Sequence, residues 1–162
     1  HLYENKIPWR KVYLSRKKIQ RTKSEEFLWR GLPKEQFLFQ NDERIDNPDL
    51  IEQFFSDLGF EIICPEDFSS FTDQIKYFNT VKTLAGVTTA GLLNSIYMPK
   101  GGTVFEMSTP LVGNGRESIH HFYKDLSFVK DHKFLSITNF RNASTIIDKI
   151  KQDKALLEFL SA

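Results

Sequence analysis

The most informative segment for the chemistry of this chain is residues 84–107. A short apolar run there ends near Gly86, and a turn of small residues, 88–91, leads into a stretch with helical character. A strand, a tight turn and a helix in this order present backbone N–H groups at the helix N-terminus, where they can bind phosphate. Such a turn also lets a helix pack closely on a sheet, and it matches neither a GxGxxG nor a Walker pattern. Both interpretations stay open on these residues alone.

Polar side chains also follow other apolar runs of the chain. Ser15 and Arg16 come directly after one such run, Glu66 follows another, and Glu106 ends a third. Ligands of an open parallel sheet bind beyond the carboxyl ends of its strands. Arginine can bind a diphosphate through two parallel hydrogen bonds. These residues are therefore candidates for contact with the phosphates, ribose or sugar of a nucleotide.

Strands and amphipathic helices alternate along the chain, which predicts an α/β scaffold for these residues. Asn47 with Pro48, and Ser70 with Asp73, are typical helix starts. The strands are expected at residues 12–14, 62–64, 84–87, 104–105 and 134–137, and the helices at 48–58, 71–81, 92–97, 118–129 and 142–160. Successive strand–helix–strand units predict a doubly wound, mostly parallel sheet with helices on both faces.

The length of 162 residues fits one domain, residues 1–162. Residues 17–46 are too long for an ordinary connection, so we interpret them as an insertion. Because the chain begins at His1 and not at Met, we expect it to be a fragment of a longer protein.

Composition gives no support to several classes of function. The net charge of +1 offers no general attraction to nucleic acid. No apolar run reaches the roughly 18–20 residues that a membrane span needs. Cys64 is the only cysteine, which rules out an intrachain disulfide framework. The histidines, at 120, 121 and 132 after His1, lack the spacing of a metal site, so we expect no metal.

Taken in order, these motifs resemble the C-terminal half of glycosyltransferase family 61. The family pattern has Ser-Arg after a strand, an arginine before an Asn-led helix, a strand ending in Pro-Glu, a helix with Gln-Ile, and a long HGAGLTN segment ending in glutamate. The matching residues here are Leu14-Ser15-Arg16, Arg44 with Asn47, GFEIICPE at 59–66, Gln74-Ile75, GVTTAGLLN at 86–94, and Met98-Pro99 through Glu106. Order and spacing agree over about residues 11–110.

The resemblance implies a Rossmann-like half of a GT-B enzyme that binds a nucleotide sugar, expected to be a UDP-sugar. It implies transfer to a glycan or glycoprotein acceptor with inversion, without an essential metal or other cofactor, and together with an N-terminal domain that this chain lacks. A bacterial or viral protein of this kind would be cytoplasmic, and a eukaryotic one would lie in the ER or Golgi lumen. The implied donor-binding residues are Ser15, Arg16, Arg44, Thr88, Thr89, Ala90, Gly91, Asn94 and Glu106, with Asn94 and Gln74 also able to shape the turn.

The sequence departs from the family pattern at Thr88-Thr89, where the family has His-Gly. A threonine hydroxyl can bind phosphate but cannot carry positive charge. This departure motivates an alternative, a non-catalytic module that binds a glycan or a partner domain. A sugar epimerase or phosphorylase of similar architecture is a third hypothesis. No residue of the sequence is assigned as general base.

Overall fold

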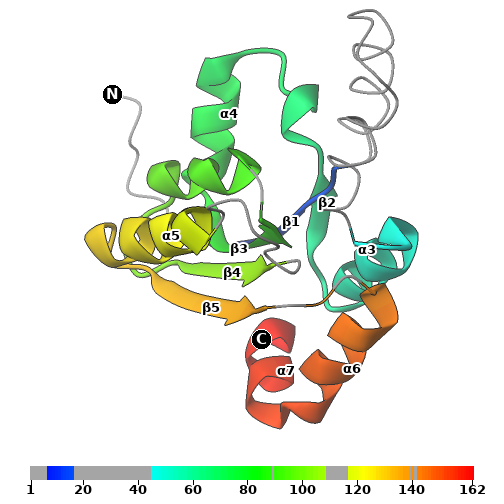
Figure 1. The fold of residues 1–162 in the computed structure, drawn as a ribbon. Coiled ribbons are helices and arrows are strands. Elements are labelled where there is room, and N and C mark those ends of the chain that lie inside the picture. The colour runs from blue at the N-terminus through cyan, green and yellow to red at the C-terminus, as the bar shows by residue number, and fades with distance from the viewer. Residues whose placement is uncertain (1–6, 17–44, 89, 109–116, 139, 141) are drawn as a thin grey trace, which may run out of the picture.

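A computed structural model describes residues 7–16, 45–88, 90–108, 117–138, 140 and 142–162. Within these residues, five parallel strands form one sheet in the order β2-β1-β3-β4-β5 (Figure 1). The strands are β1 (Arg10–Leu14), β2 (Glu61–Ile63), β3 (Val81–Val87), β4 (Thr103–Met107) and β5 (Lys133–Ile137). The predicted doubly wound α/β fold is confirmed.

The helices lie on both faces of the sheet (Figure 1). One face carries α3 (Pro48–Asp57), α6 (Ala143–Gln152) and α7 (Lys154–Ser161). The other carries α4 (Phe71–Phe78), the 3₁₀ helix η2 (Ala90–Tyr97) and α5 (Glu117–Val129), and the short 3₁₀ turn η1 (Pro65–Asp67) precedes α4. The faces alternate because right-handed crossovers that run in opposite directions along a sheet must cover opposite sides.

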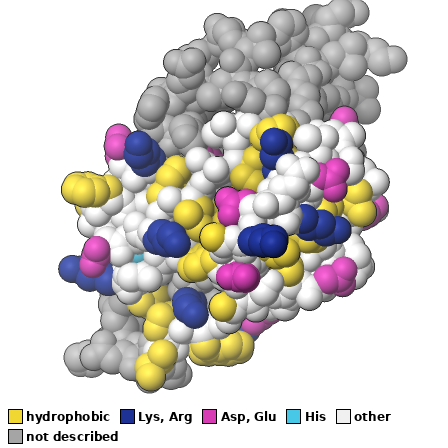
Figure 2. Space-filling model, turned by 90° about the horizontal axis from the view of Figure 1, so that it is seen from below, with side chains coloured by type: hydrophobic (Ala, Val, Ile, Leu, Met, Phe, Trp, Pro, Cys, Tyr) yellow, Lys and Arg dark blue, Asp and Glu magenta, His cyan; other side chains and the backbone are white. Residues whose placement is uncertain are grey.

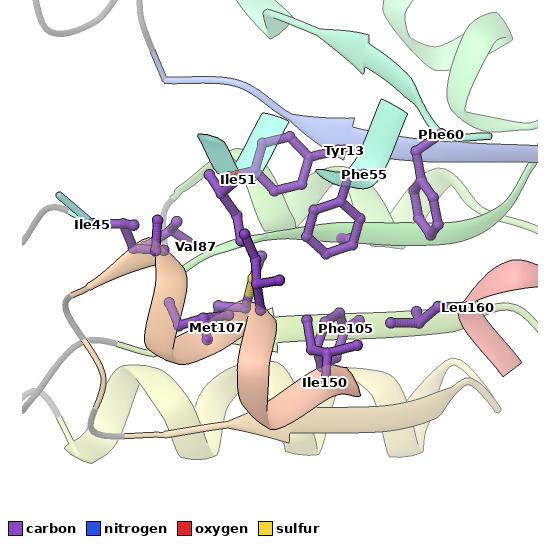
Figure 3. Close-up of a cluster of buried hydrophobic side chains, with 14 residues drawn as sticks. Tyr13, Ile45, Ile51, Phe55, Phe60, Val87, Phe105, Met107, Ile150 and Leu160 are labelled. Atoms are coloured by element: carbon purple, nitrogen blue, oxygen red, sulfur yellow. The ribbon is translucent and has the colours of Figure 1, made fainter. Parts of the chain in front are cut away.

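Apolar side chains alternate between the two faces along each strand, which divides the core in two. Tyr13 and Phe105 point to the α3 side, where they pack around Phe55 (Figure 3). The ring centroids of Tyr13 and Phe55 are 4.7 Å apart, and those of Phe55 and Phe60 are 5.0 Å apart. This aromatic cluster fixes α3 beneath β1.

The predicted helix starts are confirmed at three positions. The side chain of Asn47 accepts from the N–H of Leu50, and the hydroxyl of Ser70 accepts from the N–H of Asp73. Asn142 accepts from the first turn of α6 in the same way. These caps satisfy N–H groups that have no partner within the helix.

Three expected helices differ in the structure. Val81 begins β3 and does not continue α4, although it lies at helical spacing from Phe78. The expected α-helix at 92–97 is the 3₁₀ helix η2. Eight residues reach about 16 Å as a 3₁₀ helix and about 12 Å as an α-helix, so η2 covers more of the distance back along the strands.

The expected final helix is broken at Asp153 into α6 and α7. The Asp153 carboxylate caps α7 by accepting from the N–H of Leu156 at 3.0 Å. The break lets α7 turn back toward the sheet, where Leu160 is fully buried. The ammonium of Lys11 donates to the carbonyl of Leu58 after α3 and to that of Leu160 near the end of α7, at 2.8 and 2.9 Å. A cation is favourable there because carbonyl groups at helix C-termini carry partial negative charge.

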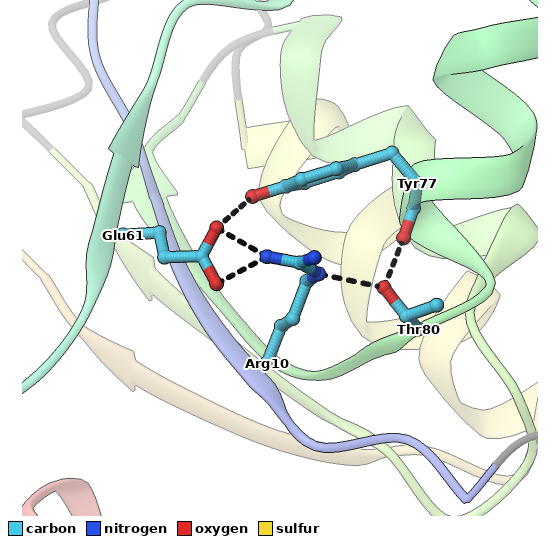
Figure 4. Close-up of polar contacts among 4 residues, drawn as sticks. All are labelled: Arg10, Glu61, Tyr77 and Thr80. Carbon is cyan, nitrogen blue, oxygen red and sulfur yellow. Dashed lines mark hydrogen bonds and ion pairs between the residues drawn. The ribbon is translucent and has the colours of Figure 1, made fainter.

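A polar network holds the amino-terminal edge of the sheet (Figure 4). The guanidinium of Arg10 donates to the Glu61 carboxylate at 2.6 Å and to the Thr80 hydroxyl at 3.0 Å. The Tyr77 hydroxyl donates to the same carboxylate at 2.8 Å. The network joins the starts of β1 and β2 to α4 and to the residue before β3. The carboxyl ends of the strands lie at the opposite edge.

Candidate functional site

A cleft of about 230 Å³ opens where β1 and β3 end. The strand order 2-1-3-4-5 reverses direction between these two strands, because the chain steps from β1 to β2 on one side and then to β3 on the other. A reversal of this kind leaves a crevice at the carboxyl edge that binds ligands in open α/β sheets. The lining residues are Leu14, Ser15, Arg16, Pro65, Glu66, Gln74, Ala90, Gly91 and Asn94.

The structure brings together many of the predicted donor-binding residues. Ser15 and Arg16 reach the cleft from the end of β1, and Ala90, Gly91 and Asn94 reach it from η2. Thr88 and Glu106 are close to each other but are not part of the cleft wall. Two further predicted residues, Arg44 and Thr89, lie outside the described residues, as does most of the expected insertion at 17–46. The end of that expected insertion belongs to the fold, since Ile45 is buried in the core.

Ser15 is held by a buried carboxylate that the sequence pattern did not identify. Its hydroxyl donates to Glu52 of α3 at 2.6 Å, and both residues are buried. A glutamate on the buried side of an amphipathic helix is the signal that could have revealed this contact. The bond fixes the chain direction at the end of β1 and so sets where the next residue, Arg16, enters the cleft.

Arg16 is partly exposed, and its charge reaches two buried tyrosines. Burial, followed by the carboxylate of Glu52, raises the pKa of Tyr13, and the positive charge of Arg16 opposes that rise. Arg16 has the same effect on Tyr123, where the raising carboxylate is Glu106. The guanidinium therefore lies within electrostatic range of groups on both faces of the sheet.

Tyr123 gives a test of this electrostatic arrangement. Burial, then the Glu106 carboxylate, raises the pKa of Tyr123 to about 12. An unfolded tyrosine titrates near pH 10, so the stability from this group is fully present below about pH 10 and is lost as the pH rises through about 12. We predict that the urea midpoint falls over this window, and that Tyr123→Phe makes the fall shallower. The same slope in the variant and the native chain would contradict the assignment.

Thr88 and Glu106 form a pair at the ends of the two central strands. The Thr88 hydroxyl donates to the Glu106 carboxylate at 2.8 Å, and the Thr88 N–H extends the strand ladder to the carbonyl of Met107 at 3.1 Å. Glu106 is fully buried. Its carboxylate therefore acts on the turn through Thr88, since solvent does not reach it.

A relay of two side-chain amides supports the turn from below. Asn94 donates through Nδ2 to the carbonyl of Gly91 at 2.8 Å, and Gln74 of α4 donates through Nε2 to Oδ1 of Asn94. Asn94 is buried, whereas Gln74 is partly exposed. The expectation that these two residues shape the turn agrees with this geometry.

A second groove, of about 260 Å³, lies between β5 and α7. Its walls include Phe105, Ser136 and Asp153, and the ammonium of Lys133 lies 4.2 Å from the ring centre of Phe159. On the side of the molecule that carries α6 and α7, acidic and basic side chains alternate without a dominant sign (Figure 2). Because this groove runs beside an edge strand and not at the strand ends, it is a less favourable place for a phosphate-bearing ligand.

Neither metal ligation nor membrane insertion has a structural basis in the residues described. No three His, Cys, Asp or Glu residues among them gather closely enough to hold a metal ion. His132 is buried, with Nε2 lying 3.1 Å from the carbonyl of Pro99. None of the helices described has the length and apolar character to cross a bilayer.

Comparison with known sequences identifies the family of the chain. The sequence pattern of the family named Glycosyltransferase 61 matches residues 1–105, which include β1, β3, the turn and all the residues that line the cleft. No curated protein sequence matches the chain. The family match covers well over half of the chain, so this protein belongs to glycosyltransferase family 61.

Proposed function

We propose that this chain is the donor-binding domain of a glycosyltransferase and that the cleft at the ends of β1 and β3 binds the diphosphate of a nucleotide sugar. The position of the cleft at the reversal of strand order carries the proposal. Arg16 supplies a positive charge in the wall of the cleft. The N-terminus of η2, at Ala90 and Gly91, supplies N–H groups in the same wall, since the first N–H groups of a helix have no partner within it.

The proposed transfer reaction depends on stabilising the negative charge of the leaving diphosphate. During transfer, the bond between the sugar's anomeric carbon and the diphosphate oxygen breaks, and the diphosphate leaves with the electron pair. An acceptor hydroxyl forms the new bond from the opposite face and loses its proton to a base, which we expect on the N-terminal domain. Arg16 and the η2 N–H groups would stabilise the negative charge that develops on the leaving diphosphate. This role suits transfer with inversion and without a metal ion.

Glu106 and Ser15 would then act as positioning residues. Glu106 holds Thr88 at the start of the turn, and Ser15 holds the end of β1 through Glu52. Their hydrogen bonds are made within the protein, so we assign the direct contacts with the diphosphate to Arg16, Ala90 and Gly91. UDP is the expected nucleotide because the family resemblance implies a UDP-sugar.

Calorimetric titration of the chain with UDP, GDP and CDP tests the proposal. Binding of at least one of them with a dissociation constant in the millimolar range or below is expected. If none binds at millimolar concentration, this domain has no donor site.

A non-catalytic module is the second candidate, and the threonine at position 88, where the family pattern has a histidine, favours it. The family histidine at this place would add a cation that threonine lacks. We predict that Thr88→His tightens UDP binding by about tenfold. The longer imidazole would extend from the turn toward the cleft, the buried Glu106 carboxylate would favour its charged form, and a charged hydrogen bond contributes about 1.5 kcal/mol.

Thr88→Gln is the matched control, since it adds a polar side chain without charge. Calorimetry should show little change for Thr88→Gln. Nucleotide affinity that stays undetectable in both variants would favour the non-catalytic module, and equal gains in both would contradict the role of charge.

A further inference from the structure

The amide relay fixes which hydrogen-bonding group Gln74 can offer to the cleft. A backbone carbonyl can only accept, so the Asn94 group that meets the Gly91 carbonyl must be its NH₂. The side-chain carbonyl oxygen of Asn94 therefore faces Gln74, and Gln74 must donate to it through its own NH₂. The side-chain carbonyl oxygen of Gln74 is then the group that can accept a hydrogen bond from a ligand. Each orientation follows from the one before it, starting from the backbone.

Gln74 combines this fixed orientation with access to the ligand. It lines the cleft and is partly exposed, whereas its partner Asn94 is buried. Glu66, in the turn η1 after β2, also lines the cleft, is exposed, and carries a carboxylate, which accepts hydrogen bonds. Arg16, which also lines the cleft, can only donate. The cleft wall thus offers donors, suited to an anion, and acceptors, suited to hydroxyl groups.

We propose that Gln74 is a specificity-determining residue of this cleft, whose side-chain carbonyl oxygen accepts a hydrogen bond from a hydroxyl of the sugar or ribose attached to the bound diphosphate. The inference rests on the proposed function and specifies which part of the ligand Gln74 contacts. The cleft of about 230 Å³ is smaller than the roughly 300–1,000 Å³ of most ligand pockets, so it suits the phosphates and one ring better than a whole nucleotide sugar.

Two substitutions separate this role from a structural one. Gln74→Met removes both the acceptor and the N–H that holds Asn94. Gln74→Glu also loses that N–H but keeps an acceptor oxygen in the cleft. If Gln74 only holds the turn, both variants behave alike. If its oxygen binds a hydroxyl, only the methionine variant loses discrimination.

The experiment measures the affinities of the native chain and both variants for pyrophosphate, UDP and UDP-glucose by calorimetry, with thermal unfolding as a check on folding. The readout is the ratio of the affinity for each hydroxyl-bearing ligand to that for pyrophosphate, which reduces the effect of the added charge of glutamate on the comparison. We expect Gln74→Met to lower this ratio about threefold to tenfold, and Gln74→Glu to keep it within about twofold. A loss already seen with UDP assigns the hydroxyl to ribose, and a loss confined to UDP-glucose assigns it to the hexose.

Two results would overturn the inference while leaving the proposed function intact. One is an unchanged ratio in Gln74→Met. The other is an equal loss in both variants, which would assign Gln74 to the structure of the turn. If the native chain binds none of the three ligands, the donor site itself is absent and the proposed function fails.

Discussion

Replacing Arg16 with methionine is expected to weaken the binding of pyrophosphate and UDP by roughly tenfold to a hundredfold. Arg16 is the arginine in the wall of the cleft, and a hydrogen bond to a charged group is worth about 1.5–3 kcal/mol. Methionine keeps most of the length of the side chain while removing its charge. Arg16→Lys should recover only part of the affinity, because an ammonium group cannot make two parallel hydrogen bonds to a phosphate. Calorimetric titration of the three proteins gives the affinities.

The control for Arg16 removes a positive charge elsewhere. Lys149 is exposed on α6, on the face of the sheet opposite to η2. Lys149→Met should leave both affinities within about twofold, since exposed charges beyond a Debye length of about 10 Å are largely screened. Equal losses in Lys149→Met and Arg16→Met would mean that net charge, and not the cleft, attracts the anion.

The largest loss of stability is expected from Phe55→Ala, which should lower the free energy of unfolding by about 3–5 kcal/mol. Phe55 is fully buried, and its ring packs against those of Tyr13, Phe60 and Phe105 (Figure 3). Truncation removes these contacts and leaves a cavity between α3 and the sheet. Urea unfolding followed by circular dichroism measures the change.

Phe128→Ala serves as the comparison, because the Phe128 side chain is 86% exposed at the end of α5. It should change the free energy of unfolding by less than about 0.5 kcal/mol. A similar loss in both variants would contradict the aromatic cluster as the main support of α3.

The fold was predictable from the sequence where a local signal is strong. The sequence predicts helix starts at Asn47, Ser70 and Asn142, and the side chains of these residues cap the helices in the structure. Strand–helix alternation predicted the parallel sheet and its two covered faces. The order of the strands within the sheet, which places the cleft, came from the structure.

Periodicity alone could not settle two element boundaries and one helix type. Val81 lies three residues after Phe78, a spacing that fits a helix, yet both residues bury into the same core from different elements. The apolar positions of the final helix continue past Asp153, although the chain turns there to bury Leu160. The spacing of the apolar residues in η2 did not distinguish its 3₁₀ geometry from an α-helix.

The sequence predicted only some residues of the candidate site, because a local pattern does not show contacts between distant parts of the chain. Ser15 and Arg16 directly follow a predicted strand. They were therefore predicted, because ligands of open α/β sheets bind beyond the carboxyl ends of the strands. The contacts that hold the site join residues far apart in sequence: 37 positions separate Ser15 from Glu52, and 20 separate Gln74 from Asn94. Such pairs form only after α3 and α4 pack on the sheet. The role proposed for Gln74 could therefore be inferred only from the relay in the structure.

The most direct test of the donor site is a titration of the isotopically labelled chain with UDP, followed by amide chemical shifts. The account predicts progressive shifts at the residues of the cleft, including the backbone of Ser15 and Gly91 and the side-chain amide of Gln74, with none of comparable size at Leu135 and Phe159 in the second groove. Shifts that gather at the second groove, or no shifts at millimolar UDP, would contradict a donor site at the ends of β1 and β3.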